Sequence, residues 1–146
     1  HTASAEAMHA IEVIAGEKPP TIHYDANPSA IYTYPEIASI GKTEETCKEE
    51  GIEYKTTQFP FAPLAKAKIE GATEGFIKLI YGPKYREIIG VHIIGARATE
   101  LIAEFCLGKV LETTGDEIGH TIHPHPTISE TVMEVAHAAL GGPIHM

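Results

Sequence analysis

Short strand-like segments fill the middle of the chain, and helical spacings of apolar residues dominate its two ends. Segments rich in β-branched and aromatic residues, broken by Gly and Pro, predict strands over residues 29–34, 36–40, 53–61, 75–81 and 87–94. The last two form a predicted hairpin, because Gly82-Pro83-Lys84-Tyr85 supplies turn residues between them. Helices are predicted over residues 3–15, 43–50, 98–111, 114–118 and 127–140.

Strands gathered in the middle and helices collected towards the end favour an α+β fold, an antiparallel sheet with helices packed on one face. Such a sheet leaves its other face for solvent or for a partner. Tyr32, Tyr34, Phe59 and Phe61 are large side chains available for that face, although Phe59 and Phe61 fit a core equally well. A homodimer would cover an exposed apolar face of this kind.

The first predicted helix stands apart from the rest of the pattern. Its apolar stripe includes Met8, Ile11 and Ile14, and Gly16 ends it. A linker-like stretch with Pro19-Pro20 follows, so the helix is expected to pack on something other than the main domain, to stay exposed or to make a new contact.

Composition narrows the possible functions. The 146 residues suit one domain, the 43% hydrophobic content suits a packed core, and the net charge of −9 argues against nucleic acid and anionic membranes. No apolar run approaches the ~20 residues that span a bilayer. Cys47 and Cys106 form no Cys-x-x-Cys pair, so we expect free thiols in a reducing compartment, with Cys106 buried and Cys47 exposed.

The segment from 120 to 130 carries the candidate chemistry. It contains His120, His123 and His125, followed by the carboxylate of Glu130. A neutral imidazole held by a carboxylate can act as a general base near neutral pH. Pro124 and Pro126 bias the preceding histidines towards extended backbone, so the base would be presented on an extended arm just before a helix.

Two other interpretations of this segment stay open. Thr127-Ile128-Ser129-Glu130 has capping-box spacing, in which Glu130 would bond the backbone N–H of Thr127, alone or in addition to orienting His125. The three histidines also suggest a metal site, but the prolines separate their side chains and no further ligand has suitable spacing. We therefore expect no metal, and a structural role for His123.

Several segments together resemble one known family. His-Pro-His-Pro-Thr-Ile-Ser-Glu at 123–130, the Asn-Pro-Ser-Ala-Ile-Tyr-Thr-Tyr-Pro-Glu run at 27–36 and Gly-Val-His-Ile-Ile-Gly at 90–95 are similar to dihydrolipoamide dehydrogenases, within the pyridine nucleotide–disulfide oxidoreductases. The resemblance identifies residues 26–146 with their C-terminal dimerisation domain and residues 1–25 with a helix and linker at the end of the FAD domain. The chain holds no Gly-x-Gly-x-x-Gly fingerprint and no redox-active cysteine pair.

The resemblance implies a role for individual residues. In the family, the intact enzyme oxidises dihydrolipoamide through its disulfide and flavin, with NAD as the electron acceptor. A His–Glu pair of one subunit forms part of the active site of the other subunit. By motif, His125 would be the base and Glu130 its orienting carboxylate. The main-chain oxygen of His125 would also lie near the flavin, and His1 matches a position that touches FAD.

The resemblance also sets expectations for cofactors and partners. FAD and NAD would belong to the intact enzyme, and this chain alone would retain neither and be inactive. We expect a homodimer, dihydrolipoamide and components of a 2-oxo acid dehydrogenase complex as partners, in the cytoplasm or the mitochondrial matrix. The alternatives are the same domain of another disulfide reductase, similar to glutathione reductase, and a non-catalytic dimerisation module.

Overall fold

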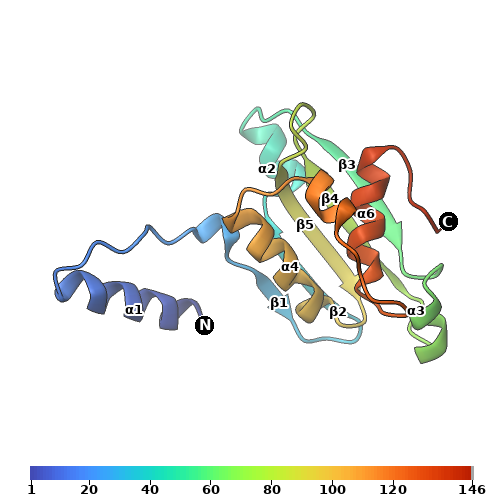
Figure 1. The fold of residues 1–146 in the computed structure, drawn as a ribbon, viewed down its shortest axis with the longest axis horizontal. Coiled ribbons are helices and arrows are strands. Elements are labelled where there is room, and N and C mark those ends of the chain that lie inside the picture. Colours follow the sequence, from blue (N-terminus) through green and yellow to red (C-terminus); the bar gives the residue numbers. More distant parts are fainter. Residues whose placement is uncertain (146) are drawn as a thin grey trace.

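The computed structural model describes residues 1–145 and contains one five-stranded antiparallel sheet with the strand order β1-β2-β5-β4-β3 (Figure 1). The strands are β1 (Ser29–Ile31), β2 (Glu36–Gly41), β3 (Lys55–Pro60), β4 (Gly75–Tyr81) and β5 (Ile88–Gly95). All four pairings are antiparallel, and β4 and β5 form the predicted hairpin. The predicted α+β class is confirmed.

Helices α4 and α6 lie side by side across one face of this sheet (Figure 1). The helical segments are α1 (Thr2–Ile14), the 3-10 turn η1 (Tyr24–Ala26), α2 (Glu44–Glu49), α3 (Ala65–Glu70), α4 (Ala98–Val110), α5 (Gly115–His120) and α6 (Glu130–Leu140). The predicted helices are confirmed, but α6 begins three residues later than expected. Helix α3 was not predicted, and it begins at Leu64 without a side-chain cap.

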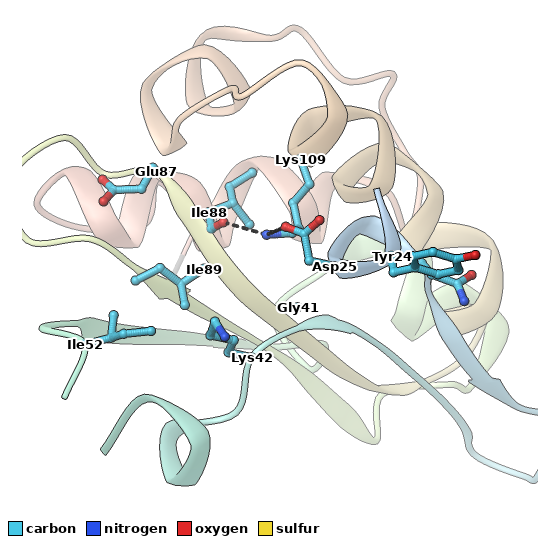
Figure 2. A pocket seen from close by; sticks show the side chains of 10 residues that line it. Tyr24, Asp25, Gly41, Lys42, Ile52, Glu87, Ile88, Ile89 and Lys109 are labelled. Carbon is cyan, nitrogen blue, oxygen red and sulfur yellow. Dashed lines mark hydrogen bonds and ion pairs between the residues drawn. The ribbon is translucent and has the colours of Figure 1, made fainter. Parts of the chain in front are cut away.

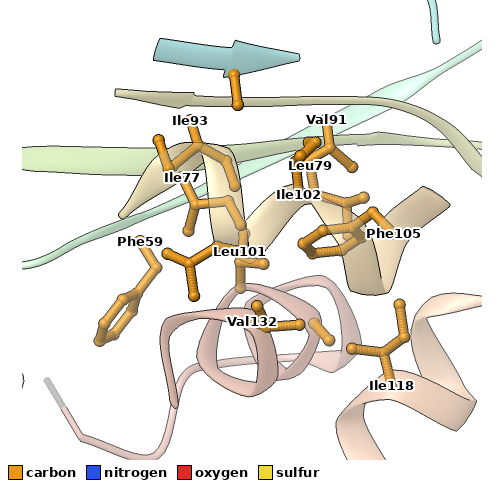
Figure 3. Packing of buried hydrophobic residues seen from close by; sticks show 14 of the residues in the cluster. Phe59, Ile77, Leu79, Val91, Ile93, Leu101, Ile102, Phe105, Ile118 and Val132 are labelled. Carbon is orange, nitrogen blue, oxygen red and sulfur yellow. The ribbon is translucent and has the colours of Figure 1, made fainter. Parts of the chain in front are cut away.

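The core lies between the sheet and the two long helices (Figure 3). Alternate residues of β4 and β5 point into it, and Ile77, Leu79 and Val91 are fully buried against Phe105 of α4 and Val132 of α6. Burial of such side chains supplies roughly 25 cal/mol per Å² of apolar surface. The helices therefore pack on the sheet through the apolar side chains that alternate onto this face of each strand.

Phe59 and Phe61 belong to this core and are 0% exposed, so of the two alternatives left open by the sequence, the core holds and the free sheet face does not. The end of β5 explains the position of Phe61. Gly95 has a φ of +152°, and a Cβ at this position would lie 2.5 Å from the Phe61 ring. Only glycine lets the ring pack this closely on the backbone.

The opposite face of the sheet carries an apolar row that crosses every strand. Residues directly opposite each other on neighbouring strands have side chains on the same face of the sheet. From β1 to β3, in the order of the strands in the sheet, the residues of this row are Ile31, Ile37, Ile94, Phe76 and Pro60. Ile31 is 49% exposed, Phe76 38% and Ile37 36%. Tyr32 and Tyr34 are exposed as expected, at the end of β1 and in the loop after it.

Helix α1 projects away from the sheet (Figure 1), and none of its residues is buried. Met8, Ile11 and Ile14 remain exposed, which is one of the outcomes left open by the sequence. Only the start of the helix is tied to the domain, through Thr2 to Asn27 at 3.0 Å and Tyr24 to Glu6 at 2.9 Å.

The two cysteines differ from expectation. Cys47 is 0% exposed on α2, the helix that the Glu44–Lys78 ion pair joins to β4 at 2.9 Å. Cys106 on α4 is only half-buried, and this burial raises the pKa of its thiol. Within residues 1–145, no helix is long and apolar enough to cross a bilayer.

Candidate functional site

The candidate site lies on the arm formed by residues 121–129, between α5 and α6. Helix α5 begins with a capping box, in which the Thr114 N–H donates to Glu117 at 2.7 Å. At its other end the Thr121 hydroxyl donates to the Glu117 carbonyl at 2.8 Å. Both ends of the helix that leads into the arm are therefore fixed by hydrogen bonds.

His125 and Glu130 meet as predicted. The Nδ1 atom of His125 lies 2.8 Å from Oε1 of Glu130, and the peptide bond after His125 is cis. The Glu130 side chain is 10% exposed, whereas the His125 side chain is 70% exposed. A buried carboxylate on the first turn of α6 therefore holds an imidazole whose other edge faces outwards.

Glu130 performs both roles that the sequence left open. Its Oε2 atom accepts the Thr127 N–H at 2.9 Å while Oε1 holds His125. The Thr127 hydroxyl does not complete a capping box; it donates to the Pro124 carbonyl at 2.7 Å. Helix α6 consequently begins at Glu130 rather than at Thr127.

The environment of Glu130 favours its ionised form. Burial alone would raise its pKa, but the Thr127 N–H and the His125 ring outweigh burial and leave the pKa below its usual value. Ionised Glu130 accepts a hydrogen bond from His125, so the proton of the neutral imidazole lies on Nδ1. The lone pair of the neutral imidazole is then on Nε2, at the exposed edge, where it can take a proton from a substrate.

His123 makes a separate pair. Its Nε2 lies 3.2 Å from Oε1 of Glu104 on α4, its Nδ1 lies 3.0 Å from the Thr121 carbonyl, and its side chain is 4% exposed. The structural role expected for His123 agrees with this burial. The sequence did not indicate Glu104, because a separation of 19 residues carries no local signal.

Each of the three histidines of the segment has a different hydrogen-bond partner. His120 Nδ1 lies 2.7 Å from the Asp116 carbonyl, one turn back on α5, while His123 and His125 pair with Glu104 and Glu130. Residues 1–145 contain no group of three or more His, Cys, Asp or Glu side chains that could hold a metal ion.

A further buried carboxylate lies one turn along α6 from Glu130. Glu134 is 0% exposed and accepts the Ile144 N–H at 2.7 Å, and its Oε1 lies 2.6 Å from Nδ1 of His145. The C-terminal segment thus folds back onto α6. The sequence interpretation missed this contact.

A separate cavity of about 450 Å³ lies beside β5 and the C-terminal half of α4 (Figure 2). Lys109 reaches across it and binds the Ile88 carbonyl at 3.3 Å and Asp25 at 3.4 Å. No residue of the arm lines it. These bonds hold the η1 turn to the domain.

His1 lies away from the arm. It is exposed at the start of α1, and its carbonyl accepts the Ala5 N–H at 3.1 Å. The N-terminus and the arm lie on opposite sides of the domain in Figure 1. The structure therefore does not bring His1 and His125, the two expected flavin contacts, to one site within this chain.

Comparison with known proteins gives consistent matches. The family profile described as the pyridine nucleotide-disulphide oxidoreductase dimerisation domain matches residues 27–136. Dihydrolipoyl dehydrogenase 3 of Pseudomonas putida is 45% identical over 136 residues, which are 93% of this chain and 29% of that protein. A dihydrolipoyl dehydrogenase of Bacillus subtilis is 43% identical over 145 residues, which are 99% of this chain and 31% of that protein.

Solved structures share the fold. LpdA from Mycobacterium tuberculosis superposes with a TM-score of 0.83 at 24% identity, covering 89% of this chain and 28% of that one. The HOCl-induced flavoprotein disulfide reductase RclA from Escherichia coli gives a TM-score of 0.77 at 21% identity, covering 86% of this chain and 29% of that one. This chain thus spans less than a third of the length of its relatives.

Proposed function

Because this chain belongs to the family of pyridine nucleotide-disulphide oxidoreductase dimerisation domains, we propose that it joins two subunits of a dihydrolipoamide dehydrogenase and supplies a catalytic base. In this proposal, His125 of one subunit enters the active site of the other. FAD, NAD and the redox-active cysteines would be held by the part of the protein outside these 146 residues.

The observation that carries the proposal is the orientation of His125. Glu130 holds Nδ1 at 2.8 Å, and the 70% exposed side chain leaves Nε2 open to a substrate from another part of the assembly. His123, by contrast, is 4% exposed and has partners at both ring nitrogens.

The chemistry required is the removal of a thiol proton. A thiol with a pKa of ~8.5 is mostly protonated near pH 7, and its thiolate is the form that attacks a disulfide. The Nε2 lone pair of His125 would take this proton, and ionised Glu130 would stabilise the resulting imidazolium. The flavin, when bound, would accept the electrons from the reduced disulfide.

The identity of the relatives favours dihydrolipoamide over other thiols. Both curated relatives named above, at 45% and 43% identity, are called dihydrolipoyl dehydrogenases. A reductase acting on glutathione would use the same domain and a similar base. Comparing lipoamide with glutathione in an assay of the full-length protein separates these two substrate classes.

The test of the base uses His125→Gln in the full-length protein. The rate of flavin reduction by dihydrolipoamide, followed by stopped-flow absorbance, should fall by roughly 10²–10⁴-fold while flavin content stays normal. His120→Gln is the matched control, because His120 is an exposed histidine on the same segment. An unchanged rate in His125→Gln would reject the catalytic role and leave a non-catalytic dimerisation module.

A further inference from the structure

The surroundings of His123 determine its protonation state. Its Nδ1 faces the Thr121 carbonyl oxygen at 3.0 Å, and its Nε2 faces both carboxylate oxygens of Glu104, at 3.2 and 3.3 Å. Carbonyl and ionised carboxylate oxygens only accept hydrogen bonds, so both contacts are hydrogen bonds when both ring nitrogens carry a proton. The geometry therefore favours an imidazolium ion over a neutral imidazole.

His123 also attaches the arm to helix α4. The two residues that flank His125 are prolines, and neither has a backbone N–H to donate. The His123 ring, 4% exposed, reaches α4, which is itself packed on the sheet. A rigid connection therefore runs from α4 through Glu104 and His123 to the backbone two residues before His125.

We propose that His123 and Glu104 are positioning residues for His125, and that their ion pair fixes the arm so that His125 keeps its hydrogen bond to Glu130. The proposal rests on the proposed catalytic role of His125 and adds two residues that do not touch the substrate. It also makes the position of the base depend on the charge of a neighbouring histidine.

Two charged groups act on His123, Glu104 from α4 and Glu130 from α6. Arg97 and Glu100 line a groove together with Glu104, and His125 lies on the same arm as His123. The Glu104 carboxylate raises the pKa of His123 above its usual ~6.5, and burial only partly opposes this. The ion pair is complete below pH ~6.5 and is lost as the pH rises through the higher value in the folded protein.

The test follows the histidine rings of this chain by ¹⁵N-detected NMR across a pH series. His123 should show two protonated nitrogens up to a midpoint above ~6.5. Above this midpoint, solvent exchange of the His125 Nδ1–H should rise by roughly fivefold, the size expected for coupling within one hydrogen-bonded network. This measurement on the unsubstituted chain needs no variant to fold.

Glu104→Gln removes the charge and keeps the shape. It should move the His123 midpoint to lower pH and raise His125 Nδ1–H exchange at pH 6 to the level that the wild-type chain reaches only at high pH. Glu100→Gln is the control, because Glu100 is exposed one turn earlier on the same helix. It should leave both signals unchanged.

A His123 that carries one protonated nitrogen at pH 6, or a His125 exchange rate that does not follow the His123 midpoint, would overturn the proposal. Both readouts come from imidazoles of this chain and need no enzyme activity. A failure here therefore leaves the catalytic role of His125 intact, and a failure of the flavin-reduction test leaves the positioning pair measurable.

Discussion

The carboxylate of Glu130 uses one oxygen to hold His125, at 2.8 Å, and the other to accept the backbone N–H of Thr127, at 2.9 Å. The same side chain thus orients the candidate base and secures the turn that leads into α6. A substitution that removes only the charge separates these two tasks from each other.

Glu130→Gln in the full-length protein should slow thiol oxidation less than His125→Gln does. The rate should fall because a neutral amide holds the Nδ1–H of His125 less firmly than the carboxylate does, so Nε2 is less well oriented towards the thiol. The melting temperature near neutral pH should fall modestly, since the amide oxygen of Gln can still accept the Thr127 N–H but without the charge of the carboxylate. A rate equal to that of the wild-type protein beside a lower melting temperature would assign Glu130 to helix capping alone.

Acid should weaken the arm through the same carboxyl group. The pKa of Glu130 is below its usual value in the folded chain, so its contribution to stability is present above the unfolded value of ~4.3 and is lost as the pH falls through the folded value. Melting temperatures of the wild-type chain and Glu130→Gln should therefore differ at pH 6 and converge at pH 3. A difference that stays constant between these two pH values would contradict this.

Gly95→Ala should destabilise the domain by about 1–3 kcal/mol, because the new methyl group would meet the Phe61 ring and the backbone has a positive φ. Denaturant unfolding measures the loss directly. Gly142→Ala is the matched control, because a Cβ at that position meets open space. Equal midpoints for the two variants would mean that Phe61 can move away at little cost.

Glu134→Ala should release the C-terminal segment from α6. Hydrogen exchange of the Ile144 amide should become fast, because its acceptor is lost, and the free energy of unfolding should fall by about 1.5–3 kcal/mol. Glu49→Ala, at an exposed position on α2, should change neither quantity. An Ile144 amide that stays protected in Glu134→Ala would show that other contacts hold the segment.

The sequence predicted most elements because their signals are local. The hairpin, the Thr114–Glu117 capping box and the Thr43 N-cap, whose hydroxyl accepts the Thr46 N–H at 3.1 Å, follow from turn and cap residues within a few positions. The His125–Glu130 pair was also predictable, because the two residues are only five positions apart.

Long-range packing limited the remaining predictions. The burial of Phe61 depends on the close approach of Gly95, and this contact leaves no pattern in the sequence. Helix α3 was missed because it has no side-chain cap, although Gly71 just after it, at a φ of +66°, was an available stop signal.

The claim that His125 serves the partner subunit can be tested with mixed dimers of the full-length protein. One subunit carries His125→Gln, and the other keeps His125 but has its redox-active cysteines replaced by serine, so each homodimer is inactive. The account predicts that the mixed dimer regains about half of the wild-type activity, because one of its two sites combines an intact disulfide with the partner's His125. A mixed dimer as inactive as either parent would contradict it.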